Sequence, residues 1–163
     1  LLLGLQSEAP RADIAAGFEA AGLVAHMHVQ QAGAPWPTLG EMINNNKRLF
    51  LYAGGSGKPI WMHHTSTYTY GTNWGTKDKR DFNCQLTNKP FKHGLFELDH
   101  TLTSPVAHPA LADANYNPFL HDRVVKCSTI HAKIPNIISL DWYSVGDGLA
   151  EVRALNLLSK PAD

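Results

Sequence analysis

Short apolar runs alternate with segments of helical periodicity along this chain of 163 residues, and this alternation constrains the fold more than any other feature. Apolar runs of this length are typical of buried strands, although residues 1–5 could also form a helix. We predict strands at residues 1–5, 48–53, 94–102 and 137–142, and helices at residues 7–21, 39–43, 118–127 and 145–159. Strands that alternate with helices predict an α/β fold with a parallel sheet.

Capping and turn residues support these helix boundaries. Pro10 suits the first turn of the helix at residues 7–21, and Gly22 follows it as a stop signal. Thr38 and Glu41 have the spacing of a capping box, which predicts a short helix after them. A further helix is predicted to begin at Pro118.

Three segments have weaker signals. Residues 23–29 alternate apolar side chains with histidine, which indicates an extended segment. Residues 58–93 are irregular, and we predict a long loop with one short strand inside it. The glycine-rich residues 54–57 follow a predicted strand, so they form either a phosphate-binding loop or a flexible turn, and the tail at residues 160–163 has no predicted element.

Composition limits the classes of function. Hydrophobic residues make up 44% of the chain, which is enough for a core, and Lys plus Arg equals Asp plus Glu at 14 each. Nucleic-acid binding is not expected because it favours a basic excess, and net charge gives no attraction to an anionic membrane. No apolar run approaches the ~18 residues of a membrane span, so no transmembrane segment is expected. We expect residues 1–163 to form a single domain segment.

Three groups of motifs resemble the PLC-like phosphodiesterases, the PI-PLC X-domain-like superfamily. The first group is WPTLGEMI at residues 36–43 with NKRL at residues 46–49. The second is DFNC at residues 81–84 with GLFELDH at residues 94–100. The third is NYNPFL at residues 115–120, PNIISLDWY at residues 135–143 and VGD at residues 145–147. These motifs stand in consistent order, and the resemblance extends from about residue 1 to residue 158.

The resemblance implies the C-terminal half of a distorted TIM-type (β/α)8 barrel, with the active site at the carboxyl ends of the strands. Four or five parallel strands cannot close a barrel, and they would leave two open edges. We therefore expect the N-terminal half, which carries the family's two catalytic histidines, to be supplied by a separate segment or a second chain. A self-contained smaller α/β domain is the alternative.

The resemblance also assigns candidate catalytic residues. Asp141 matches the carboxylate that holds one catalytic histidine in its productive tautomer. The alternative is that Asp141 caps the following loop or binds a backbone amide. His100 matches the family's Asn-His pair at a strand end, where it would contact phosphate or a second carboxylate, or would be an ordinary hydrogen-bonded histidine. His63 and His64 match loosely and are not predicted to be catalytic.

Candidate substrate-binding residues follow from the same alignment. Tyr70 and Trp74 could stack on a sugar or inositol ring, or serve as packing anchors. Lys89 stands where the family has Arg, which would remove bidentate phosphate binding, and Tyr52 lies on a predicted strand. Gly71 replaces a Glu of the family. Two further departures are Asp99 in place of Asn, and Ala53-Gly54-Gly55 where the family has an acidic residue.

The two cysteines, Cys84 and Cys127, could form one disulfide or remain buried thiols, and without a CxxC motif no zinc site is expected. Both coincide with family cysteines, so the resemblance implies that they pair. It also implies a secreted phosphoric diester hydrolase of the phospholipase C type, acting on a phosphoinositide or related phosphodiester. The alternatives are a catalytically degenerate barrel that binds carbohydrate or a lipid head group, and an interaction or toxin subunit. No cofactor is expected, with calcium left open.

Overall fold

A computed structural model describes residues 1–5, 9–55, 59–102 and 113–158 of the chain. The chain divides into two compact units. The N-terminal unit comprises Leu1–Thr69 and Phe91–Gly94, and the C-terminal unit comprises Tyr70–Pro90 and Leu95–Asp163. We describe each unit by itself, and the expectation of a single domain stays a prediction.

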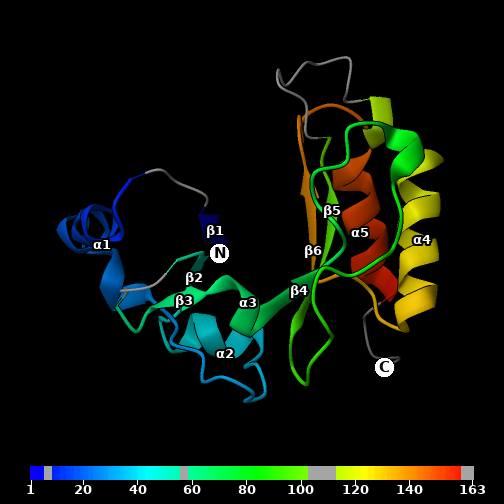
Figure 1. The fold of residues 1–163 in the computed structure, drawn as a ribbon. Helices are drawn as coiled ribbons and strands as arrows, with labels where there is room; N and C mark the ends of the chain where they lie inside the picture. The colour runs from blue at the N-terminus through cyan, green and yellow to red at the C-terminus, as the bar shows by residue number, and fades with distance from the viewer. Residues whose placement is uncertain (6–8, 56–58, 103–112, 159–163) are drawn as a thin grey trace. The chain divides into compact units, whose positions relative to one another are not determined.

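The N-terminal unit contains a three-stranded parallel sheet in the order β1-β2-β3 (Figure 1). Its strands are β1 (Leu2–Leu5), β2 (Phe50–Ala53) and β3 (Met62–His64). Its helices are α1 (Arg11–Ala20), the 3-10 helix η1 (Leu23–His26), α2 (Leu39–Asn44) and α3 (Thr65–Tyr68). One face of the sheet packs with Ile14 and Phe18 of α1 around the buried residues Met27, Leu51, Ala53, Trp61 and Met62.

The local signals set most of these boundaries. The capping box before α2 is confirmed, because the Thr38 side chain accepts from the Glu41 N–H and the Glu41 carboxylate accepts from the Thr38 N–H. The hydrogen bonds that the Thr38 N–H and the Thr38 hydroxyl donate to the Glu41 carboxylate lower the pKa of Glu41, and burial opposes this shift. The helix predicted at residues 7–21 is observed from Arg11. Residues 7–8 of that prediction lie outside the described residues, as do residues 56–57 of the glycine-rich loop and the tail at residues 160–163.

The prediction of an extended segment at residues 23–29 is wrong in its first half, which forms η1. Gly22 adopts a left-handed backbone (φ +67°) after α1, and the chain turns directly into the 3-10 helix. Only Met27 forms a parallel bridge, with Leu49. The irregular region at residues 58–93 also contains two short strands rather than one, together with two short helices.

The C-terminal unit contains a second three-stranded sheet in the order β4-β5-β6, with β5 and β6 parallel. Its strands are β4 (Thr69–Gly71), which enters this unit at Tyr70, β5 (Leu95–His100) and β6 (Ile137–Leu140). Its helices are the 3-10 helix η2 (Lys79–Asp81), α4 (Phe119–His131) and α5 (Gly148–Leu158). Helices α4 and α5 cover one face of this sheet (Figure 1). The α/β class with parallel sheets is thus confirmed.

Alternation along β5 separates the two faces of this sheet. Phe96, Leu98 and His100 are buried toward the helices, whereas Glu97 and Asp99 are partly exposed on the opposite face. The register pairs Glu97 with Ile137 and His100 with Leu140. The carboxyl ends of β5 and β6 therefore lie side by side.

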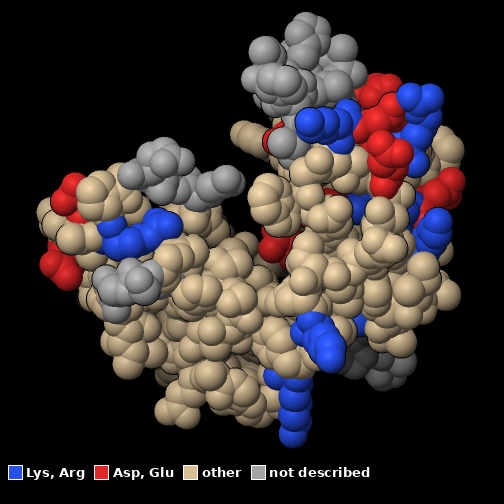
Figure 2. Space-filling view, in the orientation of Figure 1, with Lys and Arg blue, Asp and Glu red and all other residues tan. Residues whose placement is uncertain are grey.

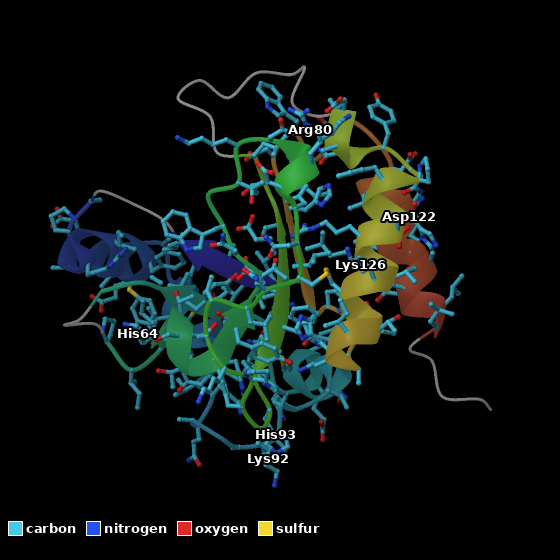
Figure 3. The ribbon with its side chains drawn as sticks, turned by 45° about the vertical axis from the view of Figure 1, so that its right-hand side comes forward. His64, Arg80, Lys92, His93, Asp122 and Lys126 are labelled. Atoms are coloured by element: carbon cyan, nitrogen blue, oxygen red, sulfur yellow. A yellow bond between two sulfur atoms is a disulfide. The ribbon has the colours of Figure 1, made fainter. Side chains whose placement is uncertain are left out.

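The predicted disulfide is present in the structure, where Cys84 and Cys127 are bonded and buried (Figure 3). It joins the irregular segment after β4 to α4, across 43 residues of sequence. No helix in the described ranges is long and apolar enough to span a membrane.

Opposite charges are intermingled on the visible surface of the C-terminal unit (Figure 2). Lys79 pairs with Asp113 at 2.5 Å, and Arg80 pairs with Asp78, whose pKa falls to about 2 because Arg80 donates hydrogen bonds to its carboxylate. This part of the surface therefore presents no field of a single sign.

Candidate active site

The candidate site lies at the carboxyl ends of β5 and β6, where parallel α/β sheets most often bind ligands. Asp99 and His100 end β5, and Asp141 follows β6 directly. Because His100 is in register with Leu140, Asp141 stands one position beyond the residue opposite His100. The structure thus brings together the two candidate catalytic residues that the sequence indicated.

Asp141 presents an exposed carboxylate at this edge. Its backbone oxygen accepts a hydrogen bond from Asn115 Nδ2 at 2.7 Å. Within the described ranges, no hydrogen bond or ion pair engages the carboxylate itself, and none joins it to a backbone amide.

His100 is buried, and both of its ring nitrogens contact the protein. Nδ1 lies 2.9 Å from Arg123 Nη1, and Nε2 lies 3.0 Å from the Ala114 oxygen. Because arginine can only donate, Nδ1 accepts and Nε2–H donates, which defines a neutral tautomer. Burial lowers the pKa of His100 to about 4; the bond to Ala114 opposes this shift, and the Arg123 charge adds to it. Its contact with a substrate stays a prediction.

Arg123 is a buried cation that the sequence reasoning missed. Its Nη1 donates to the Asp99 oxygen at 2.7 Å, its Nη2 donates to the Asn83 oxygen at 3.1 Å, and its guanidinium lies 4.2 Å from the Phe82 ring centre. Burial lowers its pKa to about 10, and the nearby Asp99 charge opposes this shift. Its position between Leu120 and Cys127, next to Val124 on the apolar stripe of α4, was the signal that could have revealed it.

The sheet face opposite the helices carries two carboxylates. Glu97 accepts a 2.5 Å hydrogen bond from Ser139 Oγ, and Asp99 accepts from both the N–H and the hydroxyl of Thr101. Burial raises the pKa of Glu97, the Ser139 bond opposes this, and the Asp99 charge adds to it. Glu97 was also missed from the sequence, although the alternation in LFELDH could have indicated a polar row on one face.

The predicted substrate-binding residues have different environments. Tyr70 is buried and stacked on Phe96 (5.5 Å between ring centres), with Lys133 Nζ at 5.3 Å, so it lies on the helix side of the sheet. Burial raises its pKa. Trp74 is 69% exposed in the segment after β4, and Lys89 is exposed. Their roles in binding stay predictions.

Tyr52 belongs to the N-terminal unit and is described within it. It is buried on β2, and its phenol covers Gly4 so closely that a Cβ there would lie 2.7 Å from the ring. On β3, the buried His63 has Nε2 bonded to the Gln30 N–H and Nδ1 bonded to the Leu51 oxygen. His64 is exposed and contacts Ser66 (Figure 3).

Gly71, which stands where the family has Glu, lies at a close contact between β4 and β5. A Cβ at this position would lie 2.9 Å from the Glu97 backbone oxygen and 3.2 Å from the Glu97 Cβ. The close approach of β4 to β5 therefore requires glycine here. A glutamate at residue 71 would need the two strands to separate.

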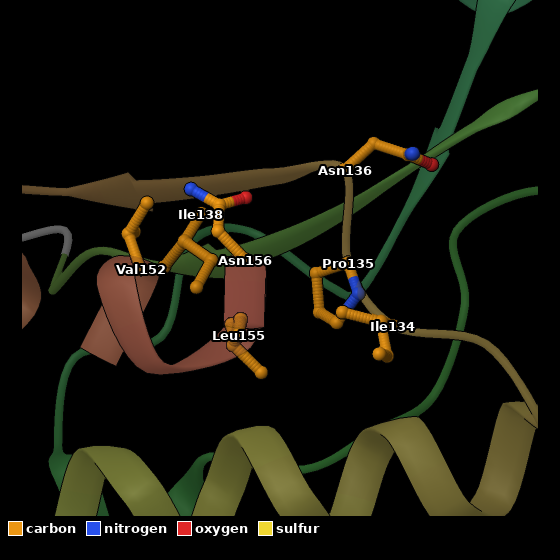
Figure 4. Close-up of a pocket in the computed structure, with 7 residues that line it drawn as sticks. All are labelled: Ile134, Pro135, Asn136, Ile138, Val152, Leu155 and Asn156. Atoms are coloured by element: carbon orange, nitrogen blue, oxygen red, sulfur yellow. The ribbon is translucent and has the colours of Figure 1, made fainter. Parts of the chain in front are cut away.

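A pocket of about 250 Å³ lies elsewhere in the C-terminal unit, between β6 and α5 (Figure 4). Its lining residues are Ile134, Pro135, Asn136, Ile138, Val152, Leu155 and Asn156. Because Asn136 precedes β6, the pocket opens near the amino end of the strand, away from Asp141.

Among the residues that the structure describes, no group of three His, Cys, Asp or Glu side chains could hold a metal ion.

Comparison with known proteins defines the class. The family model described as PI-PLC X 1 matches residues 1–156, and the chain therefore belongs to the PI-PLC X domain family. It is 26% identical over 137 aligned residues to the PI-PLC X domain-containing protein 1 of Arthroderma benhamiae. That alignment covers 74% of this chain and 45% of the relative, so the chain spans less than half of the relative's length. No solved structure matches the chain significantly.

Proposed function

We propose that this chain forms part of a secreted phosphoric diester hydrolase of the phospholipase C type, which acts on a phosphoinositide or a related phosphodiester. Membership of the PI-PLC X domain family supports this class of reaction. The observation that carries the proposal is the exposed Asp141 carboxylate at the carboxyl end of β6. A disulfide agrees with an oxidising compartment.

Asp141 acts in this proposal through a histidine that another part of the protein supplies. A carboxylate bonded to one imidazole nitrogen fixes the tautomer, so that the other nitrogen can take a proton from the attacking hydroxyl. The carboxylate also stabilises the imidazolium that forms. The second histidine of the proposed pair protonates the leaving oxygen as the P–O bond breaks. The reaction invokes no metal ion, and activity in the presence of a chelator tests the calcium alternative.

The two parallel sheets support the proposal of an incomplete barrel. Each sheet has two end strands, β1 and β3 in the first and β4 and β6 in the second, and no further strand of the described residues extends either sheet. Parallel strands are normally covered on both faces and paired on both edges in closed barrels. We propose that both sheets belong to one (β/α)8 barrel, and that an N-terminal segment or second chain supplies the remaining strands and the histidine pair.

The test compares Asp141→Asn with Asp122→Asn in the complete protein. Both substitutions remove one exposed carboxylate, but Asp122 lies on the outer surface of α4 (Figure 3). We expect Asp141→Asn to lower kcat for release of a phosphorylated head group by about 100-fold or more, since an amide favours the wrong tautomer. Asp122→Asn should retain the wild-type rate.

The outcome of this assay decides whether Asp141 takes part in catalysis and whether the protein is a hydrolase or a binding protein. An unchanged rate in Asp141→Asn would remove this residue from the mechanism. A second function, a degenerate barrel that binds a sugar or lipid head group, is favoured by Gly71 in place of Glu and by the 69% exposed Trp74. Binding of an inositol phosphate without turnover by the complete wild-type protein would support that second function and refute the hydrolase.

A further inference from the structure

Two short motifs meet at the candidate site and are joined by one backbone–backbone and one backbone–side-chain hydrogen bond. Asn115 and Asn117 precede α4, and Gly146 and Asp147 precede α5. The Asp147 N–H donates to the Asn115 oxygen at 2.9 Å, and the Asn117 N–H donates to Asp147 Oδ2 at 2.8 Å. Gly146 has φ +91°, and a Cβ there would lie 2.6 Å from the Asn115 oxygen, so only glycine fits this contact.

The Asn115 side chain fastens the turn that follows β6. The residue is 2% exposed, and its Nδ2 donates to the Asp141 oxygen at 2.7 Å and to the Val145 oxygen at 3.4 Å. These two carbonyls mark the two ends of the turn, which the Val145 N–H closes by donating to the Trp142 oxygen at 2.8 Å. One amide group therefore contacts both ends of the segment that carries Asp141.

The backbone of this turn needs such support. Trp142, directly after Asp141, has φ +54°, in the left-handed region that bulky side chains rarely occupy. A conformation of this kind persists only where surrounding contacts fix it, and such residues cluster at functional sites. In the described residues, the Asn115 amide supplies contacts on either side of Trp142.

We infer that Asn115 is a positioning residue that holds the Asp141 carboxylate in the geometry required for the proposed phosphodiester cleavage. This inference rests on the proposed function. The preceding residue, Ala114, accepts the hydrogen bond from His100 Nε2. Ala114 and Asn115 therefore connect the carboxyl end of β5 to that of β6. Asn115 contacts the backbone of Asp141 rather than its carboxylate, so its effect on the reaction is indirect, through the position of Asp141.

The experiment is a double-mutant cycle in the complete protein, with Asn115→Asp, Asp141→Asn and the pair. Asn115→Asp keeps the volume of the side chain but removes the N–H donors that bind the two carbonyls. We expect kcat to fall by roughly 10- to 100-fold, as for a catalytic group displaced by about 1 Å, with KM unchanged within about twofold. The pair should be no slower than Asp141→Asn alone, because both substitutions act on one group.

Asn136→Ala is the matched control. Asn136 Oδ1 accepts the Phe96 N–H at 2.9 Å at the amino end of β5, so its loss also removes a side-chain bond to backbone but should leave kcat unchanged. Effects of Asn115→Asp and Asp141→Asn that multiply, or a change confined to KM, would overturn the inference.

Hydrogen exchange separates the inference from the proposed function. The Val145 and Asp147 amides donate hydrogen bonds to the backbone oxygens of Trp142 and Asn115. They should exchange at least about tenfold faster in Asn115→Asp than in Asn136→Ala, because the turn opens locally. Equal protection in the two variants would refute the inference even if the protein is an active hydrolase. Faster exchange in a protein without turnover would leave the fastening of the turn established and refute only the hydrolase.

Discussion

The environment of each histidine decides what that residue can do. His100 and His63 match the family to different degrees, yet each has both ring nitrogens bonded within its own unit. Residue type alone indicates acid–base chemistry, because an unperturbed imidazole titrates near neutral pH. Burial removes that property from His100, whose pKa falls to about 4. The exposed Asp141 carboxylate, by contrast, has no such bond among the described residues.

The shifted pKa of His100 predicts that acid destabilises this protein. In the unfolded chain the imidazole takes up a proton as the pH falls below about 6.5, whereas the folded protein takes it up only near pH 4. The unfolded state therefore binds more protons between these values, and the free energy of unfolding decreases as the pH falls through this window. The contribution of His100 is up to about 3 kcal/mol.

His100→Gln tests this prediction, since glutamine can still donate to Ala114 and accept from Arg123 without titrating. Urea denaturation at pH 6.5 and pH 4 should show a smaller loss of stability in His100→Gln than in the wild type. His64→Gln, at an exposed position, is the control and should lose as much stability as the wild type. Equal pH dependence in His100→Gln and the wild type would contradict the prediction.

The contacts of several site residues were out of reach of the sequence because they depend on distant backbone groups. Arg123 binds carbonyls of Asn83 and Asp99, and Asn115 binds carbonyls of Asp141 and Val145. A backbone carbonyl has no sequence signature, so neither partner could be inferred from residue types. The position of Asp141 after a strand was predictable because residues 137–140 have a clear apolar pattern, whereas its role stays a prediction.

At the scale of elements, predictions succeeded where a segment carries its own signal. The apolar runs that end at Ala53, His100 and Leu140 form β2, β5 and β6. The capping box marks the start of α2. The prediction of an extended segment at residues 23–29 failed because seven residues of alternation are also compatible with a 3-10 helix followed by one bridge. Tertiary contacts decide such short segments, and periodicity cannot.

The disulfide is the element-scale feature with the clearest energetic consequence. Replacing Cys84 and Cys127 with serine removes a link across 43 residues. The chain-entropy estimate predicts a loss of about 4 kcal/mol in the free energy of unfolding. Urea denaturation of the double variant, compared with the oxidised and reduced wild type, measures this loss. The reduced wild type should resemble the variant, and a midpoint equal to that of the oxidised protein would contradict the estimate.

The family and the α/β class were predictable for the molecule as a whole, whereas the closure of a barrel was not. Motifs in consistent order identify the family, and alternating strands and helices identify the class. Closure would need further strands beside the end strands of both three-stranded sheets, and the described strands supply none. The proposal of a completed barrel therefore needs a direct binding experiment.

We predict that this chain forms a one-to-one complex with a polypeptide that contains the N-terminal half of a PI-PLC X domain. An open parallel edge exposes unpaired backbone groups, and an uncovered sheet face exposes apolar side chains. Alone, the chain should bind the dye ANS, and its fluorescence should fall as the complement is added. Light scattering gives the stoichiometry, and half of an unrelated (β/α)8 barrel serves as the control. If the chain stays monomeric, binds no ANS and does not bind the N-terminal half, its two sheets need no further strands.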